Sequence, residues 1–458
     1  MDFFNALPTS RILILGGGVT GSALVRFLRS RGVENIYVFD EREISVEAIT
    51  ISTELPAEAD LAIVSPGWKK NHPLVLEIQS RGIEILSEVD FAWRVRSVLA
   101  PNQRWIALTG TNGKTTTVQM VESIISASHL TGVACGNVGT SVIEAVAKVQ
   151  PYDVLALELS SFQIEWSNEA RFESAAILNI ADDHIDWHGS FDEYANAKIK
   201  LLNSAQQAVL AGGDPEIVLR STSWSGPKYF FSLDTPAIGE IGLVENLIVD
   251  RAFIKPGADA EVIAELLDIN PAVPHNVLNA MAAAGLALSV GISYAAIKRG
   301  INEFKPDHHR LEVVHTGQEI EWVNDSKATN PHAAIAALGS YLSIVWIAGG
   351  LAKGARMEEL AARMGSRIRA AILIGQDREL IAAALKSSAP EVEISYVDKV
   401  STAENLMDEV VAKAKELARP GDTVLLAPAC ASMDQFNSYA HRGECFVASV
   451  KRLVADAS

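Results

Sequence analysis

Hydrophobic residues along the chain form short runs that alternate with longer segments of helical period. The N-terminal part begins with the run RILIL at residues 11–15, continues with SALVRFLRSRG at 22–32, and reaches a second run, IYVFD, at 36–40. Short β-branched runs predict buried strands, and apolar residues three and four positions apart predict the helices between them. This alternation favours an α/β fold with mostly parallel sheets.

The alternation divides into three series. The first ends near Val98, where the polar turn Pro101-Asn102-Gln103 precedes a new run, RWIALTG. The second contains VLALELS, AAILNI and QAVLAGG, then the helical stretch HNVLNAMAAAGLALSVG, and ends near Lys305-Pro306. The third starts at Glu319 and contains EIEWVNDS, SIVWIAGG, AAILIG, EISYVD and TVLLAPA. We therefore expect three domains, at residues 1–98, 99–305 and 306–458, which suits a chain of 458 residues.

Composition and charge exclude several classes of protein. Hydrophobic residues make up 48% of the chain and charged residues 21%, as in a packed globular protein. The 39 Lys and Arg residues face 56 Asp and Glu residues, and the net charge of -17 opposes non-specific attraction to nucleic acid or an anionic membrane.

The chain carries no predicted membrane or export segment. Its most apolar stretches, such as Tyr341–Ala352, are about a dozen residues long, well short of the roughly 18 that span a bilayer. The N-terminus leads directly into a glycine turn, so it is interpreted as a first strand and not as a signal peptide. The cysteines, Cys135, Cys430 and Cys445, lack CxxC spacing, which indicates reduced thiols in a cytoplasmic protein.

The segment Thr109–Thr116, TGTNGKTT, is the strongest local signal for a ligand. It lies between an apolar strand and a helix expected to start near Thr117. Main-chain N–H groups in such a loop can surround phosphate oxygens, while Lys114 supplies positive charge and Thr115 a hydroxyl that faces magnesium. Leu108 stands where the general phosphate-loop pattern has its first glycine, which leaves a glycine-rich turn with an incidental GKT as the alternative.

A second glycine loop, GGGVTG at residues 16–21, follows the first strand. With Asp40 at the end of the next strand, it has the pattern that binds ribose and pyrophosphate in dinucleotide folds. Considered alone, this loop favours a nicotinamide or flavin enzyme, and a plain tight turn is the alternative.

Acidic and imidazole side chains follow two strands of the second series. Glu158 closes VLALELS, and the segment DDHID at 182–186 follows AAILNI. Such groups at adjacent strand ends can hold magnesium beside a nucleotide phosphate, although each alone could be a surface or capping residue. Lys198, in the helical run EYANAKIKLL, has on sequence statistics the character of a solvated lysine.

Two polar turns mark the third series. DSKATNP at 325–331 predicts a turn at a sheet edge or a helix cap. PACASMDQF at 428–436, followed by Arg442-Gly443, has small residues that would let the backbone approach a ligand, and a tight packing turn is equally consistent.

In order and spacing, these segments resemble those of the Mur ligases of peptidoglycan synthesis. The resemblance rests on GTNGKTT, ELSSFQ, DDHID, the lysine of AKIK, PHNVLNA, DSKATNP and PACASMDQF, and it covers nearly the whole chain. It implies a Rossmann-like N-terminal domain for the UDP end of the substrate and a central P-loop-type ATPase with a mostly parallel sheet. It also implies a Rossmann-like C-terminal domain that closes over ATP and D-glutamate.

DSKATNP and ACASMDQF resemble the D-glutamate-adding branch of the family. The implied reaction is ATP-dependent ligation of D-glutamate to the L-alanyl carboxylate of UDP-N-acetylmuramoyl-L-alanine through an acyl phosphate. The implied setting is cytoplasmic cell-wall synthesis in cell growth and division, by a monomer without nucleic acid partners or membrane insertion. A sibling ligase for another amino acid or a pteridine substrate, a nicotinamide dehydrogenase and a non-catalytic nucleotide-binding regulator are the alternatives.

The resemblance also implies which residues contact each substrate, with GGGVTG holding the diphosphate of the substrate instead of NAD. The positions that match contacts to the UDP substrate are Gly18, Val19, Thr20, Asp40, Arg42, Ser65, Gly67, Asn137, Ser160 and Gln163. Those that match contacts to ATP are Gly110, Thr111, Asn112, Gly113, Lys114, Thr115, Thr116, Asn276, Asn279, Arg310, Asp325 and Lys327. The positions for D-glutamate are Thr329, Lys353, Ser432 and Tyr439.

The same resemblance implies two magnesium ions. Thr115 and Glu158 would hold one, and His184 with a carbamylated Lys198 would serve the second. A carbamate offers two anionic oxygens to magnesium, whereas an ammonium would repel it. The catalytic positions are therefore Lys114, Glu158, His184 and Lys198.

Overall fold

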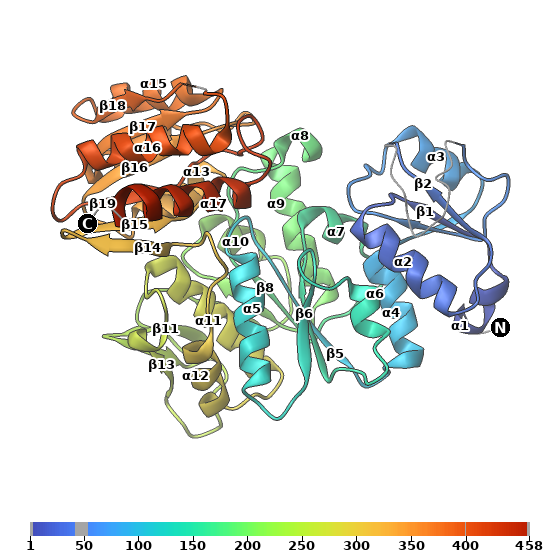
Figure 1. The fold of residues 1–458 in the computed structure, drawn as a ribbon. Helices are drawn as coiled ribbons and strands as arrows, with labels where there is room; N and C mark the ends of the chain where they lie inside the picture. The colour runs from blue at the N-terminus through green and yellow to red at the C-terminus, as the bar shows by residue number, and fades with distance from the viewer. Residues whose placement is uncertain (1–2, 42–53, 399, 456–458) are drawn as a thin grey trace. The chain divides into compact units, whose positions relative to one another are not determined.

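The three β-sheets in the computed structural model, which describes residues 3–41, 54–398 and 400–455, are each flanked by helices (Figure 1). The chain separates into two compact units. The first comprises the residues up to Ala272 together with Asn276–Phe304, and the second comprises Val273–His275 and the residues from Lys305 onward. The predicted fold class, α/β with mostly parallel sheets, is confirmed.

The first sheet has four parallel strands in the order β2-β1-β3-β4. They are β1 (Ile12–Leu15), β2 (Ile36–Phe39), β3 (Leu61–Val64) and β4 (Glu84–Ser87). Its helices are α1 (Phe3–Ala6), η1 (Leu7–Thr9), α2 (Val19–Ser30), α3 (Pro73–Ser80) and α4 (Glu88–Leu99). Every residue of β1 and β3 is buried, because parallel strands in the middle of such a sheet are covered on both faces.

The second sheet has nine strands in the order β13-β12-β11-β10-β9-β8-β5-β7-β6. The strands are β5 (Arg104–Thr109), β6 (Gly132–Gly136), β7 (Val154–Glu158), β8 (Ser174–Ile177), β9 (Ala208–Ala211), β10 (Lys228–Phe231), β11 (Glu240–Val244), β12 (Leu247–Asp250) and β13 (Glu261–Glu265). β11, β12 and β13 pair antiparallel, and the other neighbours pair parallel.

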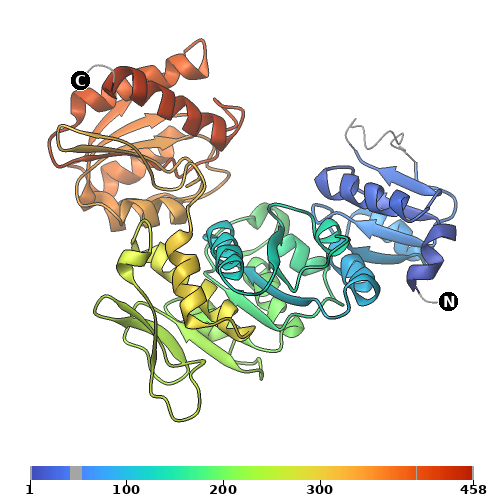
Figure 2. The same ribbon diagram turned by 60° about the horizontal axis from the view of Figure 1, so that its bottom comes forward.

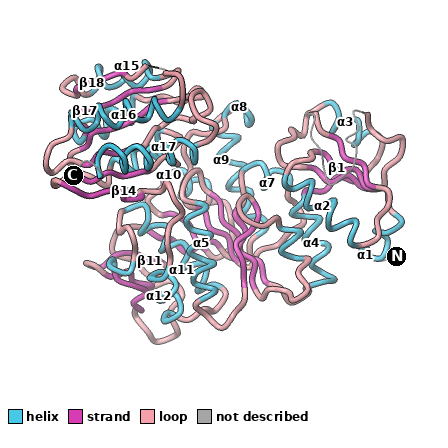
Figure 3. Tube along the Cα trace, viewed as in Figure 1, coloured by secondary structure: helices cyan, strands magenta, loops and turns pink. Residues whose placement is uncertain are grey.

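Helices flank this sheet and connect many of its strands. They are α5 (Lys114–Ser126), α6 (Val142–Val146), α7 (Ser161–Trp166), α8 (Ile185–His188), α9 (Phe191–Ile199), η2 (Lys200–Ser204), α10 (Pro215–Arg220), η3 (Leu266–Asp268), α11 (Pro274–Ser289) and α12 (Tyr294–Glu303). Figure 3 distinguishes these helices in cyan from the strands in magenta.

The third sheet, in the second unit, has the order β14-β15-β19-β16-β17-β18. Its strands are β14 (Glu312–Gly317), β15 (Ile320–Asn324), β16 (Ile344–Gly349), β17 (Ile368–Ile374), β18 (Glu393–Tyr396) and β19 (Thr423–Leu426). Only β14 pairs antiparallel. The third series thus begins at Glu312, ahead of the predicted start at Glu319. The sequence did not predict β14 because this edge strand is half-exposed and has no apolar run.

Helices cover both faces of the third sheet, which Figure 2 shows from a second direction. They are α13 (Pro331–Leu338), α14 (Glu358–Met364), η4 (Gly365–Arg367), α15 (Arg378–Ser388), α16 (Ala403–Leu417), α17 (Tyr439–Val450) and η5 (Lys451–Ala455). Alternate residues of β16 enter two cores: Trp346 packs in the core shared with α13 to α15, and Val345 in the core shared with α16 and α17.

None of the helices in the described ranges is long and apolar enough to cross a membrane. The loops that carry the sequence motifs follow the carboxyl ends of parallel strands, the edge at which α/β sheets bind ligands.

Candidate active site

The phosphate loop connects β5 to α5. α5 begins at Lys114, so the predicted helix start near Thr117 is wrong by one turn. Gly113, with φ of 81°, caps the helix in the left-handed region and turns the chain into it three residues early. A Cβ atom there would lie 2.5 Å from Asn279 Oδ1, so this glycine also admits the side chain of Asn279.

Asn179, at the end of the predicted strand AAILNI, holds the phosphate loop in place. Its Oδ1 accepts a hydrogen bond from Asn112 N (2.8 Å), and its Nδ2 donates to Asn112 O (3.0 Å). Its carbonyl oxygen accepts from Thr111 N (3.0 Å). Asn179 is not among the residues predicted from the sequence. An amide side chain directly after a buried strand was the available signal.

Lys114 lies over the same loop. Its Nζ donates to Gly110 O and to Thr111 O, both at 2.9 Å. The ammonium therefore stands among main-chain groups at the N-terminus of a 13-residue helix, where both its charge and the helix dipole favour an anion. Thr115 and Thr116 occupy the first turn of that helix.

Glu158 is a buried carboxylate with one unsatisfied oxygen. It closes β7 and pairs in register with Leu108 of β5, directly before the phosphate loop. Its Oε1 accepts from Asn137 Nδ2 (2.9 Å), whereas Oε2 has no hydrogen-bond partner among the described residues. Because a buried carboxylate oxygen without a partner costs free energy, this position fits a divalent cation.

Lys198 is buried, 1% exposed, on α9, so the interpretation as a solvated lysine is wrong. Its Nζ donates to Gly110 O (2.8 Å) and lies 4.6 Å from the ring centre of Tyr194. Burial, with the charge of Lys114 adding to it, lowers the pKa of this amine well below its usual range. Burial therefore disfavours the charged ammonium at the edge of the phosphate loop.

The DDHID segment and the helix α8 that follows it carry two imidazoles, those of His184 and His188. His184, with φ of 52°, precedes α8, and its ring packs 4.9 Å from that of Phe162. Burial lowers its pKa. His188 contacts Ser161 Oγ through Nε2 (2.9 Å), and burial, followed by the charges of His184 and Lys198, lowers its pKa to about 4. Neutral imidazoles can bind metal or accept a proton. His188 is not among the residues predicted from the sequence.

The N-terminal glycine loop is shaped by close backbone contacts. A Cβ on Gly21 would lie 2.1 Å from Gly16 O, and Gly16 itself has φ of 98°. Asp40, which is buried, accepts a hydrogen bond from Gly17 N (2.9 Å). Val19, a residue of the predicted UDP site, lies in the first turn of α2 and is 79% exposed. Such an apolar side chain is available to a ligand.

The other predicted UDP-substrate residues fall into several places. Ser65 Oγ donates to Gly16 O (3.3 Å), beside the glycine loop. Ser160 and Gln163 form a capping box at the start of α7, two residues beyond Glu158. Thr20 lies in α2, Gly67 in the loop after β3, and Arg42 outside the described residues. The structure thus places Ser65 beside the glycine loop, and Ser160 and Gln163 after the end of β7.

In the second unit, Lys327 and Tyr439 are brought together. Lys327 Nζ lies 3.7 Å from the ring centre of Tyr439, a cation–π contact. Burial raises the pKa of Asp325 to about 7, although the positive charge of Arg310 acts to lower it. The side chain of Asp325 also accepts from Leu311 N (3.3 Å). Asp325 and Lys327 thus lie in the loop after β15, with the Tyr439 ring at the start of α17 against Lys327.

The remaining D-glutamate positions lie on neighbouring loops. Lys353 follows β16, and Ser432, 3% exposed, follows β19, the strand beside it. The two loops are joined by reciprocal hydrogen bonds between Leu351 and Ala431, at 2.8 and 2.9 Å. Thr329 N donates to Lys327 O (2.8 Å). In the first unit, Asn276 Nδ2 donates to Pro271 O (3.0 Å).

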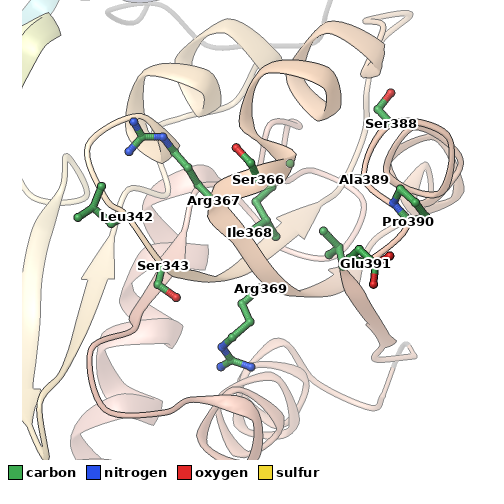
Figure 4. A pocket seen from close by; sticks show the side chains of 12 residues that line it. Leu342, Ser343, Ser366, Arg367, Ile368, Arg369, Ser388, Ala389, Pro390 and Glu391 are labelled. Atoms are coloured by element: carbon green, nitrogen blue, oxygen red, sulfur yellow. The ribbon is translucent and has the colours of Figure 1, made fainter.

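A pocket of about 540 Å³ opens elsewhere on the second unit (Figure 4). Residues that line it include Leu342, Ser343, Arg367, Arg369, Pro390 and Glu391. They surround the amino ends of β16, β17 and β18, the edge opposite the motif loops. The Arg369 guanidinium is already paired with Asp422 (Nε to Oδ2, 3.1 Å), and the pocket contains none of the predicted site residues.

Three segments match families of known domains. Residues 108–287 match the Mur ligase middle domain, 309–430 the Mur ligase glutamate ligase domain, and 10–87 the Mur ligase MurD-like N-terminal domain. The UDP-N-acetylmuramoylalanine–D-glutamate ligase of Thermobifida fusca is 43% identical over 97% of this chain and 98% of its own. The enzyme of that name from Streptomyces coelicolor is likewise 43% identical, with the same coverage.

Solved structures with lower sequence identity show the same fold. A pseudomurein peptide ligase type C from Methanothermus fervidus has a TM-score of 0.61 at 18% identity, over 98% of this chain and 100% of that structure. The MurF ligase of Thermotoga maritima in complex with ADP has a TM-score of 0.58 at 15% identity, over 99% of each.

Proposed function

The chain belongs to the Mur ligase family, and we propose on this basis that it joins D-glutamate to the alanyl carboxylate of UDP-N-acetylmuramoyl-L-alanine with hydrolysis of ATP. The observation that carries the ligase chemistry is the phosphate loop with Lys114 over it, Lys198 against its first residue and Glu158 at the neighbouring strand end. The alternative of a nicotinamide dehydrogenase does not explain this arrangement.

A carboxylate resists attack by an amine because its anionic oxygen is a poor leaving group. In the proposed reaction, an oxygen of the alanyl carboxylate attacks the γ-phosphorus of ATP in line, and ADP leaves. Lys114 offsets negative charge on the phosphoryl oxygens. The amine of D-glutamate then attacks the acyl phosphate, and phosphate departs from the tetrahedral intermediate as the amide forms.

The amine of D-glutamate must lose a proton before or during this attack. His184 lies in the DDHID segment and His188 two residues after it, and burial lowers the pKa of each, which favours the neutral imidazole. A neutral imidazole can accept the proton directly or through a water molecule. We assign this role to His184, the more exposed side chain of the two.

Magnesium is general for this family, and the donor set fits it. The unpartnered Oε2 of Glu158 and the hydroxyl of Thr115 are hard oxygen donors of the kind Mg²⁺ prefers. When bound, the ion would offset charge between the phosphates of ATP. His184 and modified Lys198 are the proposed residues for a second ion.

The environment of Lys198 favours its carbamylation. Its uncharged amine can attack CO₂, forming an N–C bond and releasing one proton to solvent. The resulting carbamate is an anion with two oxygens, so it would replace a repulsive ammonium with a ligand for magnesium. The same burial that disfavours the ammonium thus prepares the residue for modification.

The domains over residues 1–98, 99–305 and 306–458 are proposed to bind the UDP substrate, to bind ATP and to close over ATP with D-glutamate. Closure would exclude water from the acyl phosphate. We expect a smaller radius of gyration in solution scattering when nucleotide and UDP substrate are both present. We further propose a monomer in the cytoplasm without nucleic acid partners.

Phosphate release from ATP tests the function. The purified protein is given magnesium and UDP-N-acetylmuramoyl-L-alanine with D-glutamate, L-glutamate, L-lysine or meso-diaminopimelate. We expect release with D-glutamate alone and a product heavier by one glutamyl residue. Release with another amino acid would identify a sibling specificity, and no release with any would favour a non-catalytic nucleotide-binding protein.

A further inference from the structure

Arg442, in the first turn of α17, is completely buried. Its guanidinium donates to four oxygens without formal charge: Ser326 Oγ (3.0 Å), Ser326 O (3.0 Å), Cys430 O (3.2 Å) and Gly349 O (3.4 Å). Burial lowers its pKa to about 10, so it keeps its charge at neutral pH. A buried charge held by neutral oxygens is costly, and a role other than stability would account for it.

The four acceptors lie at or just after the carboxyl ends of three different strands. Ser326 follows β15, Gly349 ends β16, and Cys430 follows β19. These strands are neighbours in the order β15-β19-β16, so their carboxyl ends lie side by side. One planar guanidinium therefore joins the main chains of three adjacent loops, which the fork of five N–H donors on arginine suits and a lysine ammonium does not.

Each of these loops carries residues of the proposed nucleotide and D-glutamate site. Ser326 lies beside Asp325 and Lys327, Gly349 lies four residues before Lys353, and Cys430 lies two before Ser432. A small displacement of one loop relative to the others would separate groups that must act on one substrate.

The start of α17 also lies close to the loop after β15 and to the segment before β14. Ser326 Oγ donates to Tyr439 O (2.7 Å), which ties the loop after β15 to the helix that carries Arg442. A Cβ atom on Gly443 would lie 2.3 Å from His309 Nδ1. The Arg442-Gly443 pair therefore combines the link between loops with a close approach that only glycine allows.

We propose that Arg442 is a positioning residue that sets the three loops of the D-glutamate and nucleotide site in register without touching substrate. This inference rests on the proposed function. Its consequence is that changing Arg442 alters affinity for the substrates held by the second unit, and leaves affinity for UDP-N-acetylmuramoyl-L-alanine unchanged.

The test compares Arg442→Lys with Arg369→Lys, a partly buried arginine at the opposite edge of the same sheet. Loss of hydrogen bonds to a charged group corresponds to about a tenfold change in an equilibrium constant. For Arg442→Lys we expect the KM for D-glutamate to rise about tenfold, with the KM for the UDP substrate within about twofold of wild type. Arg369→Lys is expected to change only the melting temperature.

A purely structural role gives a different result, because a smaller folded fraction lowers kcat and leaves every KM unchanged. That outcome in Arg442→Lys overturns the proposal. Ser326→Ala, which removes one acceptor and keeps the arginine, provides a second variant if Arg442→Lys does not fold; it should raise the KM for D-glutamate in the same direction, and an unchanged KM overturns the proposal.

Hydrogen exchange separates this inference from the proposed function. In Arg442→Lys, or in Ser326→Ala if the former does not fold, amides of residues 326–330, 350–354 and 430–434 should exchange faster than in wild type, whether or not the wild-type protein ligates D-glutamate. Unchanged exchange in all three segments overturns the positioning role. If exchange is faster in the variant and the wild-type protein has no ligase activity, only the proposed function is overturned.

Discussion

The Nζ atom of Lys198 lies 2.8 Å from the carbonyl oxygen of Gly110, so a lysine of α9 contacts the first residue of the phosphate loop. The contact is formed between positions 88 residues apart in sequence. It places an amine with a strongly lowered pKa where ATP is proposed to bind. The environment that makes Lys198 unusual is therefore built by tertiary packing.

Lys198→Ala should lose most activity, on the order of 100-fold, because the proposed carbamate oxygens are removed. A small carboxylic acid such as acetate should restore part of the rate by supplying similar oxygens. Lys200→Ala, two residues away, where Nζ donates to Glu165 O (2.7 Å), is the control and should remain active. Ligase rates are measured with and without the acid. Full activity of Lys198→Ala without it would refute the role.

Glu158→Gln should weaken magnesium binding, because it removes the charge of the carboxylate whose Oε2 lacks a partner. The magnesium concentration for half-maximal activity should rise at least about tenfold. Glu165→Gln, at a carboxylate already paired with Lys70 (2.8 Å), is a matched control expected to leave it unchanged. Equal magnesium dependence in both variants would exclude Glu158 as a ligand.

Tyr439→Phe should change the KM for ATP little, because it keeps the ring on which Lys327 lies. Tyr439→Leu should raise this KM about fivefold, since a cation–π contact contributes about 1 kcal/mol. Steady-state kinetics of both variants checks this. A large effect in Tyr439→Phe would mean that the hydroxyl, and not the ring, is the functional group.

Glu88 should make the first unit less stable as pH rises. Its Oε1 accepts from Ile143 N (2.8 Å), and burial raises its pKa from 4.5 to about 7. Between these values the unfolded chain loses a proton that the folded chain retains. The free energy of unfolding therefore falls from pH 4.5 to 7 and the contribution is constant above 7.

Glu88→Gln should remove this fall. Relative to wild type, the variant should gain about 3 kcal/mol in unfolding free energy between pH 4.5 and pH 8, as a shift of this size implies. Denaturant unfolding at several pH values measures the gain. The exposed Glu77→Gln is the control, and parallel pH profiles for wild type and Glu88→Gln would count against the buried, protonated carboxyl.

Much of the fold follows from sequence because strands inside each sheet are buried on both faces. All six residues of β16 are buried, and the apolar run in SIVWIAGG predicted this strand. The antiparallel extension of the second sheet was not predicted. Edge strand β13, EVIAE, has a glutamate at each end and two exposed positions followed by two buried ones, so it has no long apolar run.

The site was only partly predictable for a related reason. The phosphate loop and its capping residues are local, and TGTNGKTT identified them as a ligand loop. The burial of Lys198, the bracing role of Asn179 and the links made by Arg442 depend on contacts between distant segments. No local pattern around AKIK distinguishes a buried lysine from a solvated one. The resemblance to the Mur ligases indicated a role for Lys198, but not for Asn179.

Oxygen transfer tests the central claim most directly. UDP-N-acetylmuramoyl-L-alanine labelled with ¹⁸O in its alanyl carboxylate is incubated with the protein, ATP, magnesium and D-glutamate. Activation as an acyl phosphate predicts one ¹⁸O atom in each phosphate released and a product heavier by one D-glutamyl residue. Unlabelled phosphate, or labelled phosphate without the D-glutamyl product, would contradict the account.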